Sequence, residues 1–310
     1  MSKSEPKNAK PKIFSRTRLV RRAARRAVCI TRYGEKSLDN SPVFFANSFP
    51  KSGTHLLTQV LDGFTRIGPA VNSGLPAIVT FEGDTGRQRL VSEIMNDIER
   101  LLPGDIAYGH LHAIPEITNL LSSEGVATYF IYRDPRDVVV SHAHYITEMS
   151  PGHIHSEFFR QELHNFNERL QASIVGIGNN ESGTGSKNAD APPLPNIRER
   201  FEPYLKWLDC QEVLKLRFED FIDQREETVG RVLDHAVKRG FVPRVPREKA
   251  EQTLWENIDP SSSPTFRSGR VGSWRIAFDK ANKRLFKDVT DDLLIRLGYE
   301  KNNDWVENND

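Results

Sequence analysis

The chain has 310 residues, of which 37% are hydrophobic and 27% charged, and its formal net charge is only +1. This length suits one large α/β domain or two small ones, and the composition is typical of a globular protein. The two cysteines are too few for a disulfide framework, and no apolar run approaches the ~20 residues that a membrane span requires. The N-terminus lacks the apolar segment of a secretory signal, so we expect a cytoplasmic protein with reduced thiols.

Residues 1–40 differ from the rest of the chain in charge. They contain twelve Lys and Arg against three Asp and Glu, so the other 270 residues are mildly acidic. We interpret this segment as a basic arm, flexible or helical, in which a helix could form between Ile13 and Ile30. Such an arm is most simply a solvated helix or tail, but it could also dock on an anionic membrane surface or act as a transit peptide.

An apolar run at 41–47 predicts the first buried strand. It leads into the small-residue loop Pro50-Lys51-Ser52-Gly53-Thr54, after which apolar residues recur at helical spacing from Leu56 to Phe64. Strand, loop and helix in this order make one half of a βαβ unit.

The remaining chain continues to alternate between strands and helices. Asp134 suits a helix N-cap and Pro135 the first helical turn. We predict strands at 105–109, 127–132 and 212–218, helices at 87–102, 115–121, 135–149, 198–208, 219–239, 247–255 and 285–297, and loops at 176–195 and 259–275. The alternation predicts an α/β fold, namely a single three-layer domain over residues 41–300 with a central parallel sheet flanked by helices, followed by a polar tail at 301–310.

The loop from Pro50 to Thr54 has the properties of an anion-binding site. Backbone N–H groups and the helix dipole favour an anion where a loop enters a helix, and Lys51 and Thr54 add a charge and a hydroxyl. The Walker A order is not met, because Lys51 precedes Gly53, so an ordinary ATPase or GTPase is disfavoured. Taken alone, the segment is more simply a strand-to-helix turn with an incidental lysine.

Four segments together resemble the sulfotransferases that use 3′-phosphoadenosine-5′-phosphosulfate (PAPS). Residues 49–54 (FPKSGT) resemble the family's 5′-phosphosulfate loop, and residues 133–141 (RDPRDVVVS) resemble its 3′-phosphate segment. Residues 217–220 (RFED) resemble its Tyr-Glu-Asp segment, and residues 267–274 (RSGRVGSW) its Arg-x-Gly-x-x-Gly-x-Trp segment. The resemblance covers about residues 41–299 and implies a P-loop-like nucleotide-binding core.

The resemblance also implies roles for individual residues. The enzyme would transfer a sulfuryl group from PAPS to a hydroxyl acceptor, release 3′,5′-diphosphoadenosine and need no metal. Lys51 would be the catalytic cation at the bridging oxygen. The other implied donor-binding residues are Ser52, Gly53, Thr54 and His55 at the 5′-phosphate, Arg133, Ser141 and Arg267 at the 3′-phosphate, and Ser268, Gly269 and Phe218 beside them.

A histidine at the end of the second predicted strand is the candidate general base. His110 occupies the place of the family's catalytic histidine, and histidine titrates in a suitable range. His112 is the alternative base. The family's lysine two residues before the histidine is Tyr108 here, and the tryptophan that stacks on adenine in cytosolic members is Leu56. Adenine would then be held by apolar packing, with Trp274 contributing.

Other functions and partners are less well supported by the sequence. An inactive nucleotide-binding relative would not need both Lys51 and His110. A kinase would need an acidic Mg²⁺ ligand after an apolar strand, but the residue that follows the third predicted strand is Arg133. We expect a hydroxyl-bearing small molecule, lipid or glycan as acceptor, and no nucleic acid as partner. Peripheral membrane contact through the basic arm is the alternative to a solvated arm. The histidines with metal-like spacing lack a carboxylate or cysteine partner pattern, so we predict no metal site: His142, His144, His153 and His155.

Overall fold

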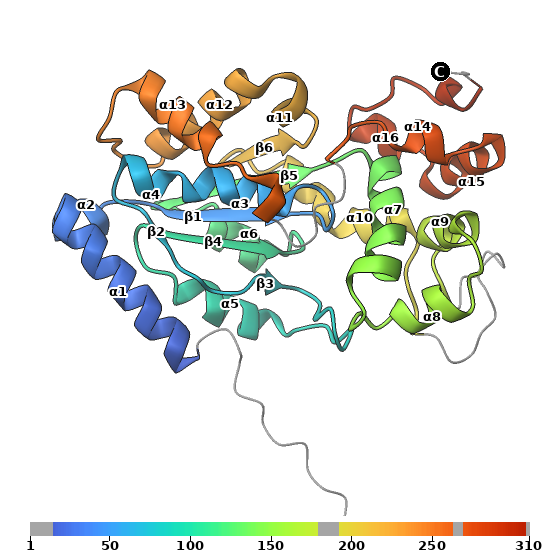
Figure 1. Ribbon diagram of the computed structural model, residues 1–310, viewed down its shortest axis with the longest axis horizontal. Coiled ribbons are helices and arrows are strands. Elements are labelled where there is room, and N and C mark those ends of the chain that lie inside the picture. Colours follow the sequence, from blue (N-terminus) through green and yellow to red (C-terminus); the bar gives the residue numbers. More distant parts are fainter. Residues whose placement is uncertain (1–14, 179–191, 263–268, 308–310) are drawn as a thin grey trace, which may run out of the picture.

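The centre of the protein is a six-stranded sheet in which every described pairing is parallel (Figure 1). The computed structural model describes residues 15–178, 192–262 and 269–307. The strand order is β2-β4-β1-β5-β6, and β3 also pairs with β4. The strands are β1 Val43–Ser48, β2 Val71–Asn72, β3 Ile78–Val79, β4 Asp105–His110, β5 Val126–Tyr132 and β6 Val213–Arg217. The three-layer fold with a parallel sheet that the sequence predicts is therefore confirmed.

Helices cover both faces of the sheet because its strands are apolar on both sides. On β1, Phe44 and Phe45 are both fully buried, but they belong to different apolar clusters on opposite faces. Above the sheet in Figure 1 lie α3 Thr54–Asp62, α4 Phe64–Ile67, α11 Asp220–Asp223, α12 Arg225–Lys238 and α13 Arg247–Glu256. Below it lie α5 Val91–Glu99 and α6 Pro115–Leu121.

A further group of helices lies beyond the carboxyl ends of the strands (Figure 1). Its α-helices are α7 Pro135–His144, α8 Ser156–Gln161, α9 Phe166–Val175, α10 Ile197–Leu205, α14 Trp274–Ala277, α15 Lys280–Thr290 and α16 Leu293–Arg296. The π-helix η2 Tyr145–Met149 and the 3₁₀-helix η5 Asp304–Val306 belong to this group as well, and the 3₁₀-helix η3 Lys206–Leu208 continues α10. The 3₁₀-helix η4 Pro260–Ser262 lies against α3, where Gln59 donates to Ser262 Oγ.

Several predicted helices are shorter or broken. The helix predicted at 219–239 divides into α11 and α12, because Gln224 has φ −133° and ψ 49°, outside the helical region. The helix predicted at 285–297 divides at Asp291, whose φ is 51°. The helix predicted at 135–149 becomes a π-helix from Tyr145 onward.

Two helices precede β1. They are α1 Arg16–Tyr33 and α2 Glu35–Asp39, and α1 runs along the outer margin of the sheet beside β2 (Figure 1). On its inner side, the guanidinium of Arg22 forms a buried ion pair with Asp105 at the start of β4. Among the described residues, no helix is long and apolar enough to cross a membrane.

Candidate functional site

The candidate site lies where three neighbouring strands end. Ser48 ends β1, His110 ends β4, and Arg133 follows the last residue of β5. Since β1 pairs with β4 on one side and with β5 on the other, these three residues reach the same edge of the sheet. In open parallel sheets, ligands bind at this edge.

The loop from Pro50 to Thr54 enters α3 through two residues of positive φ. Lys51 has φ 68° and Gly53 has φ 96°, and α3 begins directly at Thr54. The loop thus leads into a helix N-terminus at the edge of the sheet, where backbone N–H groups and the helix dipole favour an anion. A methyl group built on Gly53 would lie 2.6 Å from Cδ2 of Phe218, so the loop and the residue after β6 are in close contact.

We predict that Gly53→Ala disrupts the loop. The new Cβ would clash with Phe218 and the φ of 96° is unfavourable for alanine, so we expect affinity for 3′,5′-diphosphoadenosine to fall at least about tenfold. Titration calorimetry measures this. Gly125→Ala is the matched control, since Gly125 has φ 78° but nothing within 4 Å of an added Cβ. Equal affinity of the two variants would contradict the close packing of the loop.

A hydroxyl pair connects the loop to the candidate base. Ser48 Oγ lies 2.7 Å from Thr54 Oγ1 and 3.0 Å from His110 Nδ1. The strand end itself is held by Asn47, whose side-chain amide donates to Leu111 O at 3.0 Å and accepts from Leu111 N at 2.8 Å. The imidazole thus has a defined position relative to the first turn of α3.

Ser48 contacts Nδ1 of His110 through two atoms, its hydroxyl at 3.0 Å and its carbonyl oxygen at 3.1 Å. The carbonyl can only accept, and an Nδ1–H that donates to it leaves the lone pair on Nε2. Burial lowers the pKa of His110 below its usual 6.5, and the nearby His55 and Lys51 lower it further against the opposing carbonyl contact. At neutral pH the ring is therefore uncharged, which is the form a general base needs.

The other two histidines near the loop differ in surroundings. The ring of His112 packs between Tyr204 and Phe81, at centroid distances of 4.8 and 5.4 Å, and burial lowers its pKa to about 4. His55 is half-buried in the first turn of α3, where burial and the charge of Lys51 lower its pKa. Of the two candidate bases, the structure brings His110 to the loop and His112 to an aromatic cluster.

The ammonium of Lys51 lies over an aromatic ring. Its Nζ is 4.0 Å from the ring centroid of Tyr145, the first residue of the π-helix after α7. Such a cation–π contact is an electrostatic attraction between the ammonium and the face of the ring. Tyr145 had no role in the sequence prediction, because only the folded chain brings α7 to the loop.

Arg133 forms the second cationic part of the site. Its guanidinium lies 4.5 Å from the ring centroid of Phe218, and Nη2 donates to Asp137 Oδ2 and to Arg270 O at 3.1 and 2.6 Å. Phe218 also faces Gly53, so the loop and Arg133 lie around the same ring. Two buried polar atoms here have no hydrogen-bond partner among the described residues, Ser52 Oγ and Arg133 Nε.

Asp137 ties the segment after residue 268 to α7. Asp137 is only 1% exposed. Its two carboxylate oxygens accept hydrogen bonds from the backbone N–H groups of Gly272 and Trp274, at 2.9 Å each. Asp137 lies in the motif at residues 133–141, but the sequence pattern indicates no role for it. The contacts with Gly272 and Trp274 join residues 135 and 137 positions apart, which a local sequence pattern cannot reveal.

We predict that Asp137→Asn lowers the free energy of unfolding by about 2–4 kcal/mol, because asparagine keeps only one acceptor oxygen for the two N–H groups and Arg133 loses its ion-pair partner. Urea unfolding followed by circular dichroism measures it. The exposed Asp288→Asn in α15 is the control and should change stability by less than about 0.5 kcal/mol. A similarly small change for Asp137→Asn would contradict the importance of these contacts.

The remaining predicted site residues are placed as follows. Ser141 lies half-buried in α7, two turns after Arg133. Gly269 has φ 59°. Arg267 and Ser268 lie outside the described residues, so the structure does not place them. Across the described ranges, no group of three or more His, Cys, Asp and Glu side chains is positioned to hold a metal ion.

Comparisons with known proteins identify the family to which the chain belongs. The model of the sulfotransferase domain family matches residues 110–298, a range that includes Arg133, Ser141 and Phe218 and begins after the loop. A search of curated proteins finds no match.

Solved structures share the fold at low identity. Retinol dehydratase in complex with androsterone and inactive cofactor PAP is 16% identical, with a TM-score of 0.52 over 83% of each chain. The same enzyme in a complex with retinol and PAP has equal identity and TM-score over 83% of this chain and 84% of that one. Mouse sulfotransferase SULT7A1 complexed with PAP is 16% identical, with a TM-score of 0.51 over 88% and 92%. Because the family model matches more than half of its residues, the chain belongs to the sulfotransferase domain family.

Proposed function

We propose that the protein transfers a sulfuryl group from PAPS to the hydroxyl of a small acceptor. The observation that carries this proposal is that two buried polar atoms, Ser52 Oγ in the loop and Arg133 Nε after β5, have no hydrogen-bond partner among the described residues. Buried polar atoms are normally hydrogen-bonded, so these two favour a ligand with two separate anionic groups. A 5′-phosphosulfate and a 3′-phosphate on one adenosine meet this requirement, and the PAP complexes of the similar structures agree with it.

The residues present would bind the donor in two places. The backbone of the loop with Lys51, Ser52 and Thr54 would hold the 5′-phosphosulfate, with His55 beside them. Arg133 would hold the 3′-phosphate through its planar guanidinium, with Ser141, Gly269, Arg267 and Ser268 as further proposed contacts. Phe218 would supply apolar packing between them. We expect no metal to be needed.

Lys51 and His110 would carry the chemistry. As the acceptor oxygen attacks sulfur in line, the S–O bond to the 5′-phosphate breaks and charge accumulates on the bridging oxygen, which the Lys51 ammonium would stabilise. His110 Nε2 would take the acceptor's hydroxyl proton, while Nδ1–H stays bonded to Ser48 O. The products are a sulfate ester and 3′,5′-diphosphoadenosine.

The acceptor is proposed only by class. Androsterone and retinol occupy similar structures, and aromatic side chains surround His112 here, which favours a small, largely apolar alcohol or phenol over a glycan. A lipid is the alternative. The thiols of Cys29 and Cys210 are unpaired, which is compatible with the cytoplasmic location that we propose.

Transfer of radiolabelled sulfate from PAPS to a panel of alcohols, phenols, sterols and glycolipids tests the proposal. We expect a labelled sulfate ester with at least one acceptor, and no transfer when adenosine 5′-phosphosulfate, which lacks the 3′-phosphate, replaces PAPS. Binding of 3′,5′-diphosphoadenosine without transfer to any acceptor would favour an inactive relative. Absence of binding would overturn the donor assignment.

A further inference from the structure

The basic helix α1 is held to the body on one side only. Arg22 and Arg26 form ion pairs with Asp105, and Arg25 donates to Asn72 O at 2.9 Å. Cys29 is buried on the same side. These contacts fix the orientation of the helix, so the residues on its other side face outward in a defined arrangement.

The outward side of α1 combines valines with arginines. Val20 and Val28 are each 68% exposed, and the alanines between them at 24 and 27 are exposed too. Exposed Arg16, Arg21 and Arg32 border this apolar strip, and the helix contains seven arginines and no acidic residue. Arginines beside an exposed apolar strip, with no acidic residue, are typical of a helix that lies in a membrane interface.

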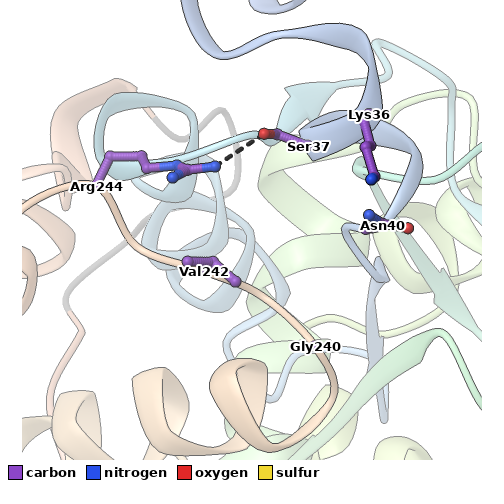
Figure 2. A pocket seen from close by; sticks show the side chains of 6 residues that line it. All are labelled: Lys36, Ser37, Asn40, Gly240, Val242 and Arg244. Carbon is purple, nitrogen blue, oxygen red and sulfur yellow. Dashed lines mark hydrogen bonds between the residues drawn. The ribbon is translucent and has the colours of Figure 1, made fainter.

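A hollow of about 260 Å³ lies just beyond the C-terminal end of α1, lined by Lys36, Ser37, Asn40, Gly240, Val242 and Arg244. Figure 2 shows Lys36 and Asn40 together on one side and Arg244 on the other, with its guanidinium donating to Ser37 Oγ at 2.8 Å. Two cations, a hydroxyl and an amide therefore surround the hollow, beside the exposed Val242. These groups match the chemistry of a phosphodiester.

We propose that the outward side of α1 and this hollow together dock on an anionic phospholipid bilayer. The arginines and Lys36 would contact the lipid phosphates and anionic headgroups, and Val20 and Val28 would enter the interface. Exposed Glu35 and Asp39 on α2 reduce the positive charge beside the hollow, so α1 supplies most of the attraction. A nucleic acid would use the cations and gain nothing from the valines, which is why a lipid surface fits better.

The charge distribution gives this docking a single orientation. Outside residues 1–40 the chain is net negative, so an anionic surface attracts the α1 side and repels the rest. The hollow lies at the amino ends of the strands, since β1 begins at Val43, soon after α2 ends at Asp39. Lys51 and His110 are at the opposite, carboxyl edge (Figure 1), so docking would leave the candidate site open to donor and acceptor.

Co-sedimentation of the full chain with vesicles tests the proposal. We expect binding to phosphatidylcholine vesicles that contain about 30% phosphatidylserine and little binding to phosphatidylcholine alone. The affinity for the anionic vesicles should fall as the salt concentration rises from about 0.1 to about 0.5 M, because salt screens contacts between exposed charges. The triple variant Arg16→Gln, Arg21→Gln, Lys36→Gln should bind about a hundredfold more weakly, at about fivefold per cation. The control replaces three exposed lysines elsewhere, Lys249, Lys280 and Lys301, by glutamine and should bind within about twofold.

The apolar part needs its own variant. Val20→Ser with Val28→Ser should weaken vesicle binding several-fold, whereas Val237→Ser with Ile295→Ser, also exposed, should not. Circular dichroism checks that each variant is folded. Equal binding of the triple variant and the control, or equal binding to neutral and anionic vesicles, would overturn the proposal. Salt-sensitive binding that is unaffected by the two valines and is matched on duplex DNA would also overturn it, in favour of a general polyanion surface.

Discussion

Lys51→Ala is expected to lower kcat by about a hundredfold to a thousandfold, the range for removing one group that stabilises transition-state charge. The lysine lies in the loop that enters α3, and its ammonium lies over the ring of Tyr145. From this position in the loop, the ammonium would stabilise a bridging oxygen of the donor as negative charge develops there. Alanine keeps the loop's backbone N–H groups, so the affinity for 3′,5′-diphosphoadenosine should fall much less than kcat. Single-turnover measurements with PAPS separate the two effects.

Two further variants make this prediction specific. Tyr145→Leu removes the ring beneath the ammonium but keeps the charge, so we expect a loss of less than about tenfold. Lys280→Ala, an exposed lysine in α15, should have no effect. If Lys51→Ala lost donor affinity and kept kcat, the lysine would serve binding alone. If Tyr145→Leu were as damaging as Lys51→Ala, the ring would have a larger role than holding the lysine.

The sequence could predict the central strands because they are apolar on both faces and bounded by turns. β1, β4, β5 and β6 were all expected within two residues of their observed limits. β2 and β3 have two residues each and exist only through pairing with β4, so no periodicity marks them. The helix predicted at 87–102 starts later, at Val91, because the segment before it forms a turn closed by the bridge between Phe81 and Gln88.

The sequence could predict the site residues that follow strand ends, but not the contacts that orient those residues. The loop, His110 and Arg133 follow apolar strands, and parallel strands bring such residues to one edge. Contacts that orient these residues depend on the register between distant segments. Ser48 and His110 are 62 residues apart, and Arg133 meets the carbonyl of Arg270 across 137 residues. Single-sequence patterns carry no information about such pairs.

His110→Ala is expected to lower kcat by about a hundredfold to ten-thousandfold while the protein still binds 3′,5′-diphosphoadenosine with nearly unchanged affinity. The imidazole is oriented by Ser48, and none of the contacts that close the loop onto Phe218 involves it. Removing it therefore takes away the proton acceptor and leaves the donor site. His112→Ala is the matched control, since that ring packs against Tyr204 and Phe81 and should cost less than about tenfold.

The pH dependence of kcat/KM provides an independent readout of the same base. Burial, with His55 and Lys51, lowers the pKa of His110, so the active neutral form persists until the pH falls below the usual 6.5. We expect a flat profile near neutrality and a loss of one decade per pH unit only on the acidic side of 6.5, below the lowered pKa. This limb should disappear in the residual activity of His110→Ala and persist in His112→Ala. A limb that persists in His110→Ala and disappears in His112→Ala would transfer the role of base to His112, and one that moves above pH 6.5 would contradict the buried, neutral imidazole.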